Sequence, residues 1–287
     1  MTDLRAAGPI PAAPIARIES LTRGGAFAAA GILAALNAQA DHIIMDLSWQ
    51  SPVDALLNLG GISAVIWAAM LAAWKIGHES DETLRGPGDV TVLATVIVFS
   101  FLPVSYAAQA GLLLCAGYLL ATSGWDHDAE RRTAFVLLAL TGPLIWGRLV
   151  LRLFEAPILS LDARIVGAAI GSTVEGNIVP FANGSGRFII GDPCSSVHNM
   201  SLAIVLWTTA AMLFKVRIDR PYLLIGIAMA GSMFALNIVR LSLIGILPAQ
   251  FDFLHDGGGA ILFGWTGLIL AAALAGFGVL RADARQR

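Results

Sequence analysis

Charged residues are scarce in this sequence. Asp, Glu, Lys and Arg make up only 13% of its 287 residues, whereas 57% are hydrophobic and the mean hydropathy is +0.75. Soluble globular proteins carry about 25% charged residues, so this chain has too few to cover a water-facing surface. The formal net charge of −2 also excludes binding to nucleic acid through bulk electrostatics. The composition therefore excludes an ordinary soluble enzyme and predicts a protein embedded in a lipid bilayer.

Cysteine and the common catalytic motifs are scarce as well. The two cysteines, Cys115 and Cys194, are too few for a disulfide scaffold or a cysteine-based zinc or iron–sulfur site. The sequence contains no Walker A run, no His-Glu-x-x-His and no Gly-x-Ser-x-Gly. Its histidines and acidic residues have no metal-ligand spacing, so we expect neither a metal nor an organic cofactor.

Long hydrophobic runs are what the sequence has instead. A helix that crosses a bilayer needs about 20 apolar residues, and runs of this kind follow one another along the chain. They predict an all-α polytopic membrane protein with about eight transmembrane helices. The runs lie at 24–40, 55–76, 89–106, 107–123, 133–153, 199–216, 221–247 and 259–280.

These runs divide the chain into a tail, one membrane domain and one long connection. We expect 1–23 to be a flexible cytoplasmic tail, 24–287 to be a single integral membrane domain, and 154–198 to be an extracytoplasmic connection within it. The apolar stretch 26–36 with the small residues at 38–40 also resembles a cleavable signal peptide. We favour a retained first helix, and cleavage would remove only that span.

The basic residues orient the bundle. If the N-terminus is cytoplasmic, 13 of the 18 Lys and Arg residues fall in inner loops and tails. The outer turns after the first and seventh runs contain aspartates but no Lys or Arg. The positive-inside rule therefore predicts that both termini are cytoplasmic. The other five basic residues lie toward the outer side: Arg148, Arg152, Arg164, Arg187 and Arg240.

Arg240 is the most unusual polar residue, because ionisable groups at membrane depth are costly and usually functional. It lies seven residues before Leu247, which places it about 10 Å below the outer end of the seventh run. Asn237 lies three residues earlier on the same helix face. A side chain that snorkels to the interface would explain Arg240 alone, but it does not explain Asn237 one turn deeper. The pair indicates a polar site inside the bundle.

Cys194 directly precedes the sixth run and is the candidate nucleophile. At a helix N-terminus, free N–H groups and the helix dipole are expected to lower the pKa of a thiol; the plainer alternative is a buried structural cysteine. Cys115 lies in the middle of a run, so a disulfide between the two is not expected. His255 opens the eighth run, and His198, four residues after Cys194, is a second possible base.

With the N-terminus inside, Cys194, Arg240 and His255 all lie at the outer ends of the last three helices, and together they fit acyl transfer. The thiolate would attack a peptide carbonyl. Arg240 would hold the thiolate or stabilise the developing oxyanion. His255 would serve as general acid to the leaving amine and then as base to the acceptor.

The ordered set Cys194-Ser195, Asn237-x-x-Arg240 and His255, with a glycine-rich helix start after it, resembles the exosortase/archaeosortase family. These are membrane-embedded cysteine transpeptidase-like enzymes of prokaryotes. The resemblance implies that Cys194, Arg240 and His255 are catalytic, with Asn237 and Ser195 in support. It also assigns the base to His255, whereas spacing alone leaves His198 open.

The resemblance extends upstream of the cysteine, where 171–179 and 186–190 are similar to two short extended segments of the family. Apolar alternation and the Asn183-Gly184 turn independently predict a short extracytoplasmic β-hairpin before the sixth helix. The family commonly has Ala-Cys-Ser-Gly where this chain has Pro-Cys-Ser-Ser at 193–196, which indicates a divergent member.

The resemblance implies a substrate class as well. Such enzymes recognise C-terminal sorting signals of exported proteins, each made of a short motif, a single transmembrane helix and a basic tail. They cut at the outer face of the cytoplasmic (inner) membrane through a Cys thioester, with water, a lipid or a polysaccharide as the acceptor. Arg148 and Arg152, one helical turn apart, would contact an acidic motif or a lipid headgroup, or simply snorkel.

Two other classes remain open. A transporter or channel would use Arg240 with Arg148 or Arg152 as an anion pathway, although the lack of an evident internal repeat disfavours it. A non-enzymatic envelope assembly factor would need none of the three groups. Cys194→Ser would leave either function intact but would abolish a transpeptidase.

Overall fold

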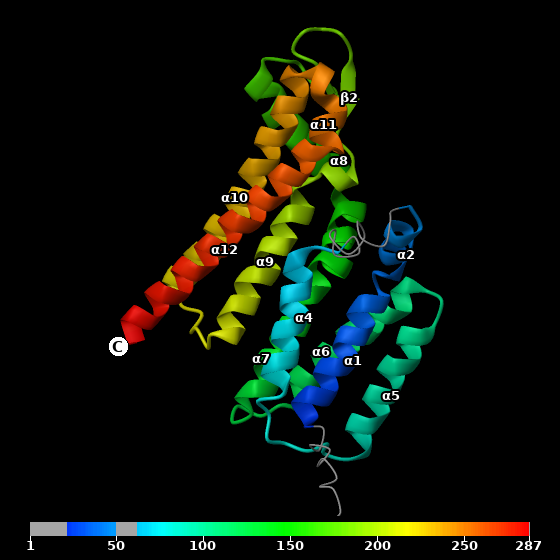
Figure 1. Ribbon diagram of the computed structural model, residues 1–287, viewed down its shortest axis with the longest axis vertical. Helices are drawn as coiled ribbons and strands as arrows, with labels where there is room; N and C mark the ends of the chain where they lie inside the picture. Colours follow the sequence, from blue (N-terminus) through cyan, green and yellow to red (C-terminus); the bar gives the residue numbers. More distant parts are fainter. Residues whose placement is uncertain (1–21, 50–61, 287) are drawn as a thin grey trace, which may run out of the picture.

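The computed structural model describes residues 22–49 and 62–286, which are mostly helical (Figure 1). Residues 1–21, 50–61 and 287 lie outside the described part, and with them most of the expected tail and the start of the run at 55–76. The helices are α1 (Arg23–Asn37), α2 (Ala40–Trp49), α4 (Ala64–Gly77), α5 (Pro87–Phe101), α6 (Ser105–Thr122), α7 (Asp128–Thr141), α8 (Gly147–Ile170), α9 (Ser196–Leu213), α10 (Arg220–Ile246), α11 (Phe251–His255) and α12 (Gly258–Gln286).

Within the described residues, five helical segments are long and apolar enough to cross a membrane. They correspond to the expected runs at 107–123, 133–153, 199–216, 221–247 and 259–280. The three other runs contain α1, α4 and α5, which are only 15, 14 and 15 residues long. The chain is thus a multi-pass, mostly helical membrane protein, as predicted. In the part of the chain that the structure describes, five of the eight expected runs form helices of full membrane-spanning length.

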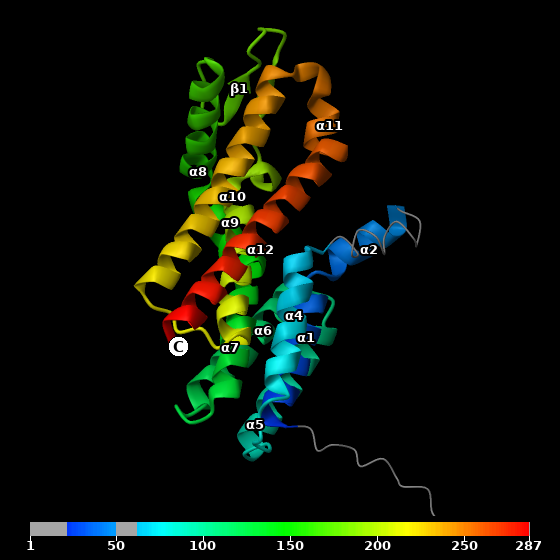
Figure 2. The ribbon, with the colours of Figure 1, turned by 60° about the vertical axis from the view of Figure 1, so that its left-hand side comes forward.

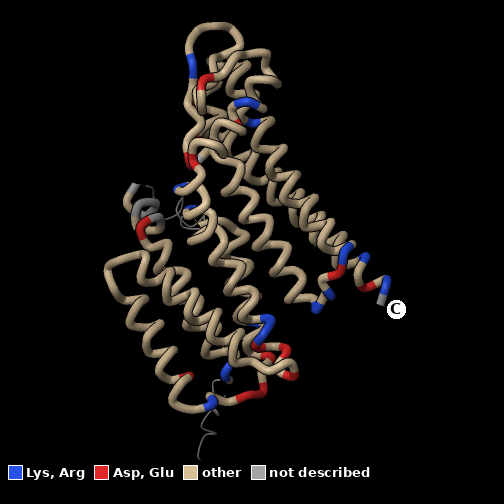
Figure 3. The backbone as a smooth tube through the Cα atoms, turned by 180° about the vertical axis from the view of Figure 1, so that it is seen from behind, with Lys and Arg blue, Asp and Glu red and all other residues tan. Residues whose placement is uncertain are grey.

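Charged residues gather toward the ends of the bundle and are rare along the middle of the helices (Figure 3). One such cluster surrounds Arg23, which is fully buried. Its guanidinium donates to the carboxylates of Asp89 at 2.8 Å and Glu130 at 2.7 Å. Arg23, which we expected to end the flexible tail, therefore begins α1 instead, because carboxylates from two other helices hold it there.

The expected connection at 154–198 begins as a helix rather than a loop. The chain passes from α7 through a π-helical turn, Gly142–Trp146, into α8, which bends near Phe154 and continues to Ile170. One face of this continuation is buried at helical spacing by Leu159, Ala163 and Val166. Hydropathy ends the run at 153 because charged residues follow, but the helical period of the apolar residues does not end there.

The predicted β-hairpin is present. Strands β1 (Ile178–Pro180) and β2 (Arg187–Ile189) pair antiparallel, with Val179 opposite Phe188. The turn between them contains Gly184 at a φ of +72°, a conformation that glycine adopts without strain. Val179 and Phe188 are buried against the second hydrophobic core described below, so one side of the hairpin is anchored to the bundle.

Two groups of helices meet along α9. The first core is built mainly from α1, α4, α6 and α7 together with one side of α9, and the second from α8, the hairpin, α10 and the segment around Cys194. Helices α10 and α12 run side by side, joined by a 3-10 turn (Pro248–Gln250) and α11 (Figure 2). This path brings the segment before α9, the end of α10, α11 and the hairpin together in the second core.

Candidate active site

Cys194 ends a short 3-10 turn, Asp192–Cys194, that leads into α9. Its backbone N–H donates to the Gly191 carbonyl at 3.0 Å, and its side chain is almost fully buried. Ser195 follows as the N-cap of α9, and its hydroxyl accepts from the N–H of Val197. The local sequence thus places the thiol directly before a capped helix start.

His255, at the end of α11, is the group that meets this thiol. Its Nε2 lies 3.3 Å from the Cys194 Sγ, although 61 residues separate them in the chain. Its Nδ1 lies 2.6 Å from a carboxylate oxygen of Asp256, and the ring of Phe251 stacks on the imidazole. Because a carboxylate only accepts, the neutral imidazole carries its proton on Nδ1, and Nε2 is left to accept from the thiol. The arrangement is a Cys–His pair with a carboxylate behind the histidine.

The surroundings of Cys194 raise the pKa of its thiol. Burial is the main cause; the positive charge of Arg240 and the backbone N–H of Gly191 oppose it, and the carboxylate of Asp256 adds to it. The expectation of a lowered pKa is therefore wrong. The thiol is protonated at neutral pH and needs a base to react.

Besides this burial, the first N–H groups of α9 do not donate to the thiol, because they bind other acceptors. The N–H of Ser196 donates to Asp162 and that of Val197 donates to the Ser195 hydroxyl, so neither is aimed at sulfur. These N–H groups carry the positive end of the helix dipole. Because these N–H groups donate to other acceptors, they stabilise a Cys194 thiolate only weakly.

Two buried polar side chains fix the segment that carries the cysteine. The Nδ2 of Asn237 donates to the Cys194 carbonyl at 2.8 Å and to the Ser196 hydroxyl at 3.2 Å. Asp162 accepts from the backbone N–H of Ser196 at 3.1 Å and from its hydroxyl at 3.2 Å. Sequence reasoning found Asn237 but missed Asp162, and the available signal was a carboxylate within an apolar helical pattern at 159–166.

Arg240 holds the histidine rather than the cysteine. Its Nε donates to the Leu254 carbonyl at 3.0 Å, and its Nη2 donates to the His255 carbonyl at 2.7 Å. Among the described residues, its hydrogen bonds go to these two carbonyls and none goes to Cys194. Interfacial snorkelling does not account for a guanidinium bound to two backbone carbonyls. Arg240 therefore anchors the end of α11, while its charge still acts on the nearby thiol.

The remaining candidates lie apart from this group. His198 is exposed and lines a second cavity together with Arg148, Arg152 and Asp192. Of the two histidines near Cys194, it is His255 that contacts the sulfur. The structure thus brings together Cys194, His255, Arg240 and Asn237, and it separates them from His198 and the two arginines of α8.

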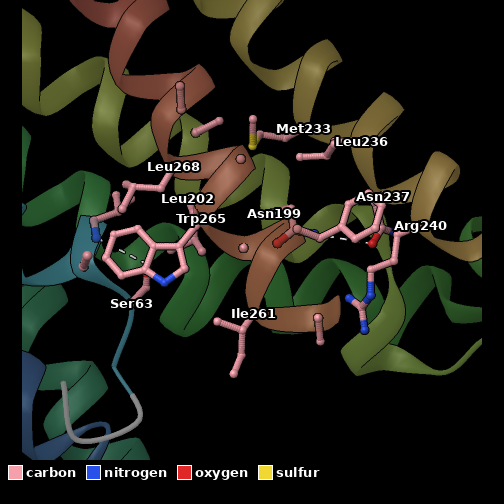
Figure 4. A pocket seen from close by; sticks show the side chains of 18 residues that line it. Ser63, Asn199, Leu202, Met233, Leu236, Asn237, Arg240, Ile261, Trp265 and Leu268 are labelled. Carbon is pink, nitrogen blue, oxygen red and sulfur yellow. Dashed lines mark hydrogen bonds between the residues drawn. The ribbon is translucent and has the colours of Figure 1, made fainter. Parts of the chain in front are cut away.

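A largely apolar pocket of about 340 Å³ adjoins the site (Figure 4). Asn237 and Arg240 lie at one end of it, and Ser63 and Trp265 lie toward the other. Its walls come from the start of α4 and from α9, α10 and α12. A substrate segment in this pocket would therefore be surrounded by apolar side chains and end beside the polar cluster.

Comparison with known families gives a match over most of the chain. Residues 49–272, most of the chain, match the family described as transmembrane exosortase, and the matched part includes Cys194, Asn237, Arg240 and His255. No curated protein and no solved structure matches the chain. Exosortases are membrane sorting enzymes of the cysteine peptidase and transpeptidase type. The chain therefore belongs to the transmembrane exosortase family.

Proposed function

We propose that this protein is a membrane-embedded cysteine peptidase and transpeptidase that removes C-terminal sorting signals from exported proteins. The observation that carries the proposal is the contact of 3.3 Å between the Cys194 Sγ and the His255 Nε2 in a chain of the exosortase family. A nucleophile within reach of a base, itself oriented by a third group, is the arrangement required for acyl transfer.

In the acylation step, the His255 Nε2 takes the proton of the Cys194 thiol while Sγ attacks the carbonyl carbon of the scissile peptide bond. A C–S bond forms and the carbonyl electrons move onto oxygen. As the tetrahedral intermediate collapses, the C–N bond breaks, and the leaving amine takes the proton from Nε2. The products are a thioester on Cys194 and a released C-terminal fragment.

In the second step an acceptor attacks the thioester. The His255 Nε2 removes a proton from the attacking water, hydroxyl or amine, a new bond to the acyl carbon forms, and the C–S bond breaks. The proton returns to sulfur, which regenerates the thiol. The Asp256 carboxylate stabilises the imidazolium that exists between the two transfers.

Arg240 has two effects in this scheme. By binding the carbonyls of Leu254 and His255, it keeps the imidazole at contact distance from the sulfur. Its charge also favours the anions that form during the reaction, first the thiolate and then the oxyanion. We propose the first effect as the dominant one, since its hydrogen bonds are made to the histidine segment.

The apolar pocket supports lateral entry of the substrate from the bilayer. A sorting signal contains a transmembrane helix, which would lie against α4, α9, α10 and α12 and bring its scissile bond toward Cys194. We place both termini in the cytoplasm and the site at the outer face of a prokaryotic inner membrane, because the basic residues favour that orientation.

The proposal is tested by comparing protein C-termini in cells that express the wild-type protein, Cys194→Ser or Cys115→Ser. Cys115 is a buried thiol that donates to the Phe27 carbonyl far from the site, so its variant is the matched control. We expect a few single-span exported proteins to keep their C-terminal helix and basic tail only in the Cys194→Ser cells. Identical C-termini in all three strains, at equal expression, would contradict the proposal.

A further inference from the structure

A second cavity, of about 710 Å³, lies beside the candidate active site and is not used by the mechanism above. Asp192 and His198, on either side of Cys194 in the chain, belong to its wall. The rest of the wall comes from residues near the ends of α1, α4, α6 and α8, from the π-helical turn Gly142–Trp146 and from the first turns of α9. Its hydrogen-bonding side chains include Gln39, Gln109, Arg148, Arg152, His198 and Ser201.

The charges of this cavity favour an anion. Arg148 and Arg152 lie one helical turn apart on α8, so their side chains share a face. Among the described residues that line the cavity, Asp192 is the one carboxylate. Together with the two arginines it gives a net positive charge, without counting His198. Arginine forks match the oxygen geometry of phosphate and carboxylate groups.

Two uncharged donors point to the same ligand chemistry. Gln39 and Gln109 line the cavity and are each only 6% exposed. Their amide nitrogens have no hydrogen-bond partner among the described residues. Buried donors without an acceptor are rare in folded proteins, and an oxyanion in the cavity would supply one.

The surface around the arginines is apolar. Trp146, Leu149, Val150 and Leu153 are large hydrophobic residues on the same stretch of helix, and all are exposed. Basic side chains flanked by exposed apolar ones are typical of the depth at which lipid headgroups meet acyl chains. A ligand with a charged head and an apolar tail would satisfy both features.

We propose that this cavity binds a phosphate oxyanion, carried by a membrane phospholipid or free in solution, through Arg148 and Arg152 with Gln39 and Gln109. The apolar surround favours the phospholipid. This binding is independent of the Cys194 chemistry, so its test needs no enzymatic readout.

The experiment uses the full-length protein in dodecyl maltoside, a detergent without phosphate. Retention of phosphatidylglycerol and of a phosphate-free galactolipid is measured by native mass spectrometry, and inorganic phosphate binding by a radiolabel assay. The variants are Arg148→Gln/Arg152→Gln, the charge-retaining Arg148→Lys/Arg152→Lys, and Arg164→Gln as the matched control. Arg164 is exposed on the same helix and does not line the cavity.

We expect the double Gln variant to retain phosphatidylglycerol at least about tenfold more weakly than the wild type, with the Lys pair close to wild type. Galactolipid retention and the Arg164→Gln variant should not change. If inorganic phosphate alone shows this pattern, the free anion is the ligand. Gln109→Leu removes an amide donor without altering the charge, and it should also weaken binding. This variant keeps the inference testable if the arginine variants fail to fold.

Two results would overturn the inference. One is equal retention of phosphatidylglycerol and equal phosphate binding by the wild type and the double Gln variant. The other is a wild-type protein that prefers neither phosphatidylglycerol over galactolipid nor phosphate over buffer.

Discussion

At the scale of single residues, the proposed nucleophile is a buried thiol and the proposed base is an imidazole in contact with it. Burial raises the pKa of the Cys194 thiol, while the imidazole of His255 lies 3.3 Å from its sulfur. A thiol whose pKa is raised carries less thiolate at neutral pH than an ordinary cysteine. The nucleophile is therefore expected to form only as His255 removes the proton, and a resting thiolate is not expected.

Substitution of His255 by Gln should expose this dependence. Because the thiolate is the reacting form and the pKa of the Cys194 thiol is raised, alkylation in the variant should become fast only above about pH 8.5, where an ordinary cysteine ionises. At pH 7 we expect alkylation at least about tenfold slower than in the wild type. The measurement is the rate of iodoacetamide labelling against pH, in a Cys115→Ser background. Superimposable profiles would contradict the role of His255 as the base.

Asp256 is predicted to support that base. Its carboxylate lies 2.6 Å from the His255 Nδ1, but its side chain is 84% exposed, so water screens the interaction. Asp256→Asn should slow signal cleavage about tenfold, well below the loss of about 10⁴-fold seen where such a carboxylate is buried. Asp252→Asn, on the same exposed turn, is the control for a general charge effect. Equal rates for the two variants would remove Asp256 from the mechanism.

At the scale of elements, hydrogen bonds between side chains and backbone connect α8, the start of α9, α10 and α11 around Cys194. Asn237 joins α10 to the Cys194 carbonyl, Asp162 joins α8 to the start of α9, and Arg240 joins α10 to the end of α11. In each case the side chain donates a hydrogen bond to, or accepts one from, the backbone of another segment. The geometry of the Cys194–His255 pair therefore depends on the packing of three helices as much as on the two residues.

Arg240→Lys separates the positioning effect of this arginine from its charge. A lysine keeps the charge, but it cannot reproduce the fork that donates from two nitrogens to the Leu254 and His255 carbonyls. We expect cleavage to fall about a hundredfold, a loss of the order reported for displaced catalytic groups. The measurement is cleavage of an identified substrate by equal amounts of folded protein, with Arg164→Lys as the control. Near-wild-type activity would show that charge alone is sufficient.

Much of this architecture is readable in the sequence. Polar groups inside or beside apolar runs are costly and usually functional. This is the signal that singles out Cys194, Asn237, Arg240 and His255. The hairpin follows from alternation and from the Asn183-Gly184 turn. These signals are local, so a single sequence contains them.

The hydrogen-bond partners of these residues are not local, so a single sequence does not indicate them. Nothing in the spacing indicates that Arg240 binds the backbone of His255, or that Asp162 takes the first N–H of α9, 34 residues away. The direction of the pKa shift of Cys194 is not local either, because burial in the folded chain is its main cause. Hydropathy likewise ends the fifth run at 153, since it averages over the charged residues that follow in α8.

At the scale of the whole molecule, helix length differs between the two groups. α1, α4 and α5, at 14 or 15 residues, span about 21–23 Å, whereas the 27 residues of α10 span about 40 Å. The hydrocarbon core of a bilayer is about 30 Å thick. Local thinning is one way in which a bilayer accommodates short helices. It would bring the polar surface of the bilayer closer to the second cavity, whose wall includes residues of both groups.

Labelling of single cysteines tests the expected orientation. In a Cys115→Ser/Cys194→Ser background, Ala182→Cys in the hairpin turn should react with a membrane-impermeant maleimide in intact cells. Arg217→Cys, between α9 and α10, should react only after permeabilisation, because the positive-inside rule places it in the cytoplasm. Both positions are exposed in the structure. The reverse pattern would invert the topology and move Cys194 to the cytoplasmic side.

The most direct test of the central claim is detection of the acyl-enzyme. The full-length protein is isolated from cells that contain an identified substrate, and the peptide that carries Cys194 is examined by mass spectrometry before and after treatment with hydroxylamine. We predict a hydroxylamine-labile adduct on Cys194 whose mass matches the new C-terminus of the exported protein. Cys115 should carry no such adduct. Continued removal of the sorting signal in cells with Cys194→Ser at normal levels would contradict the account.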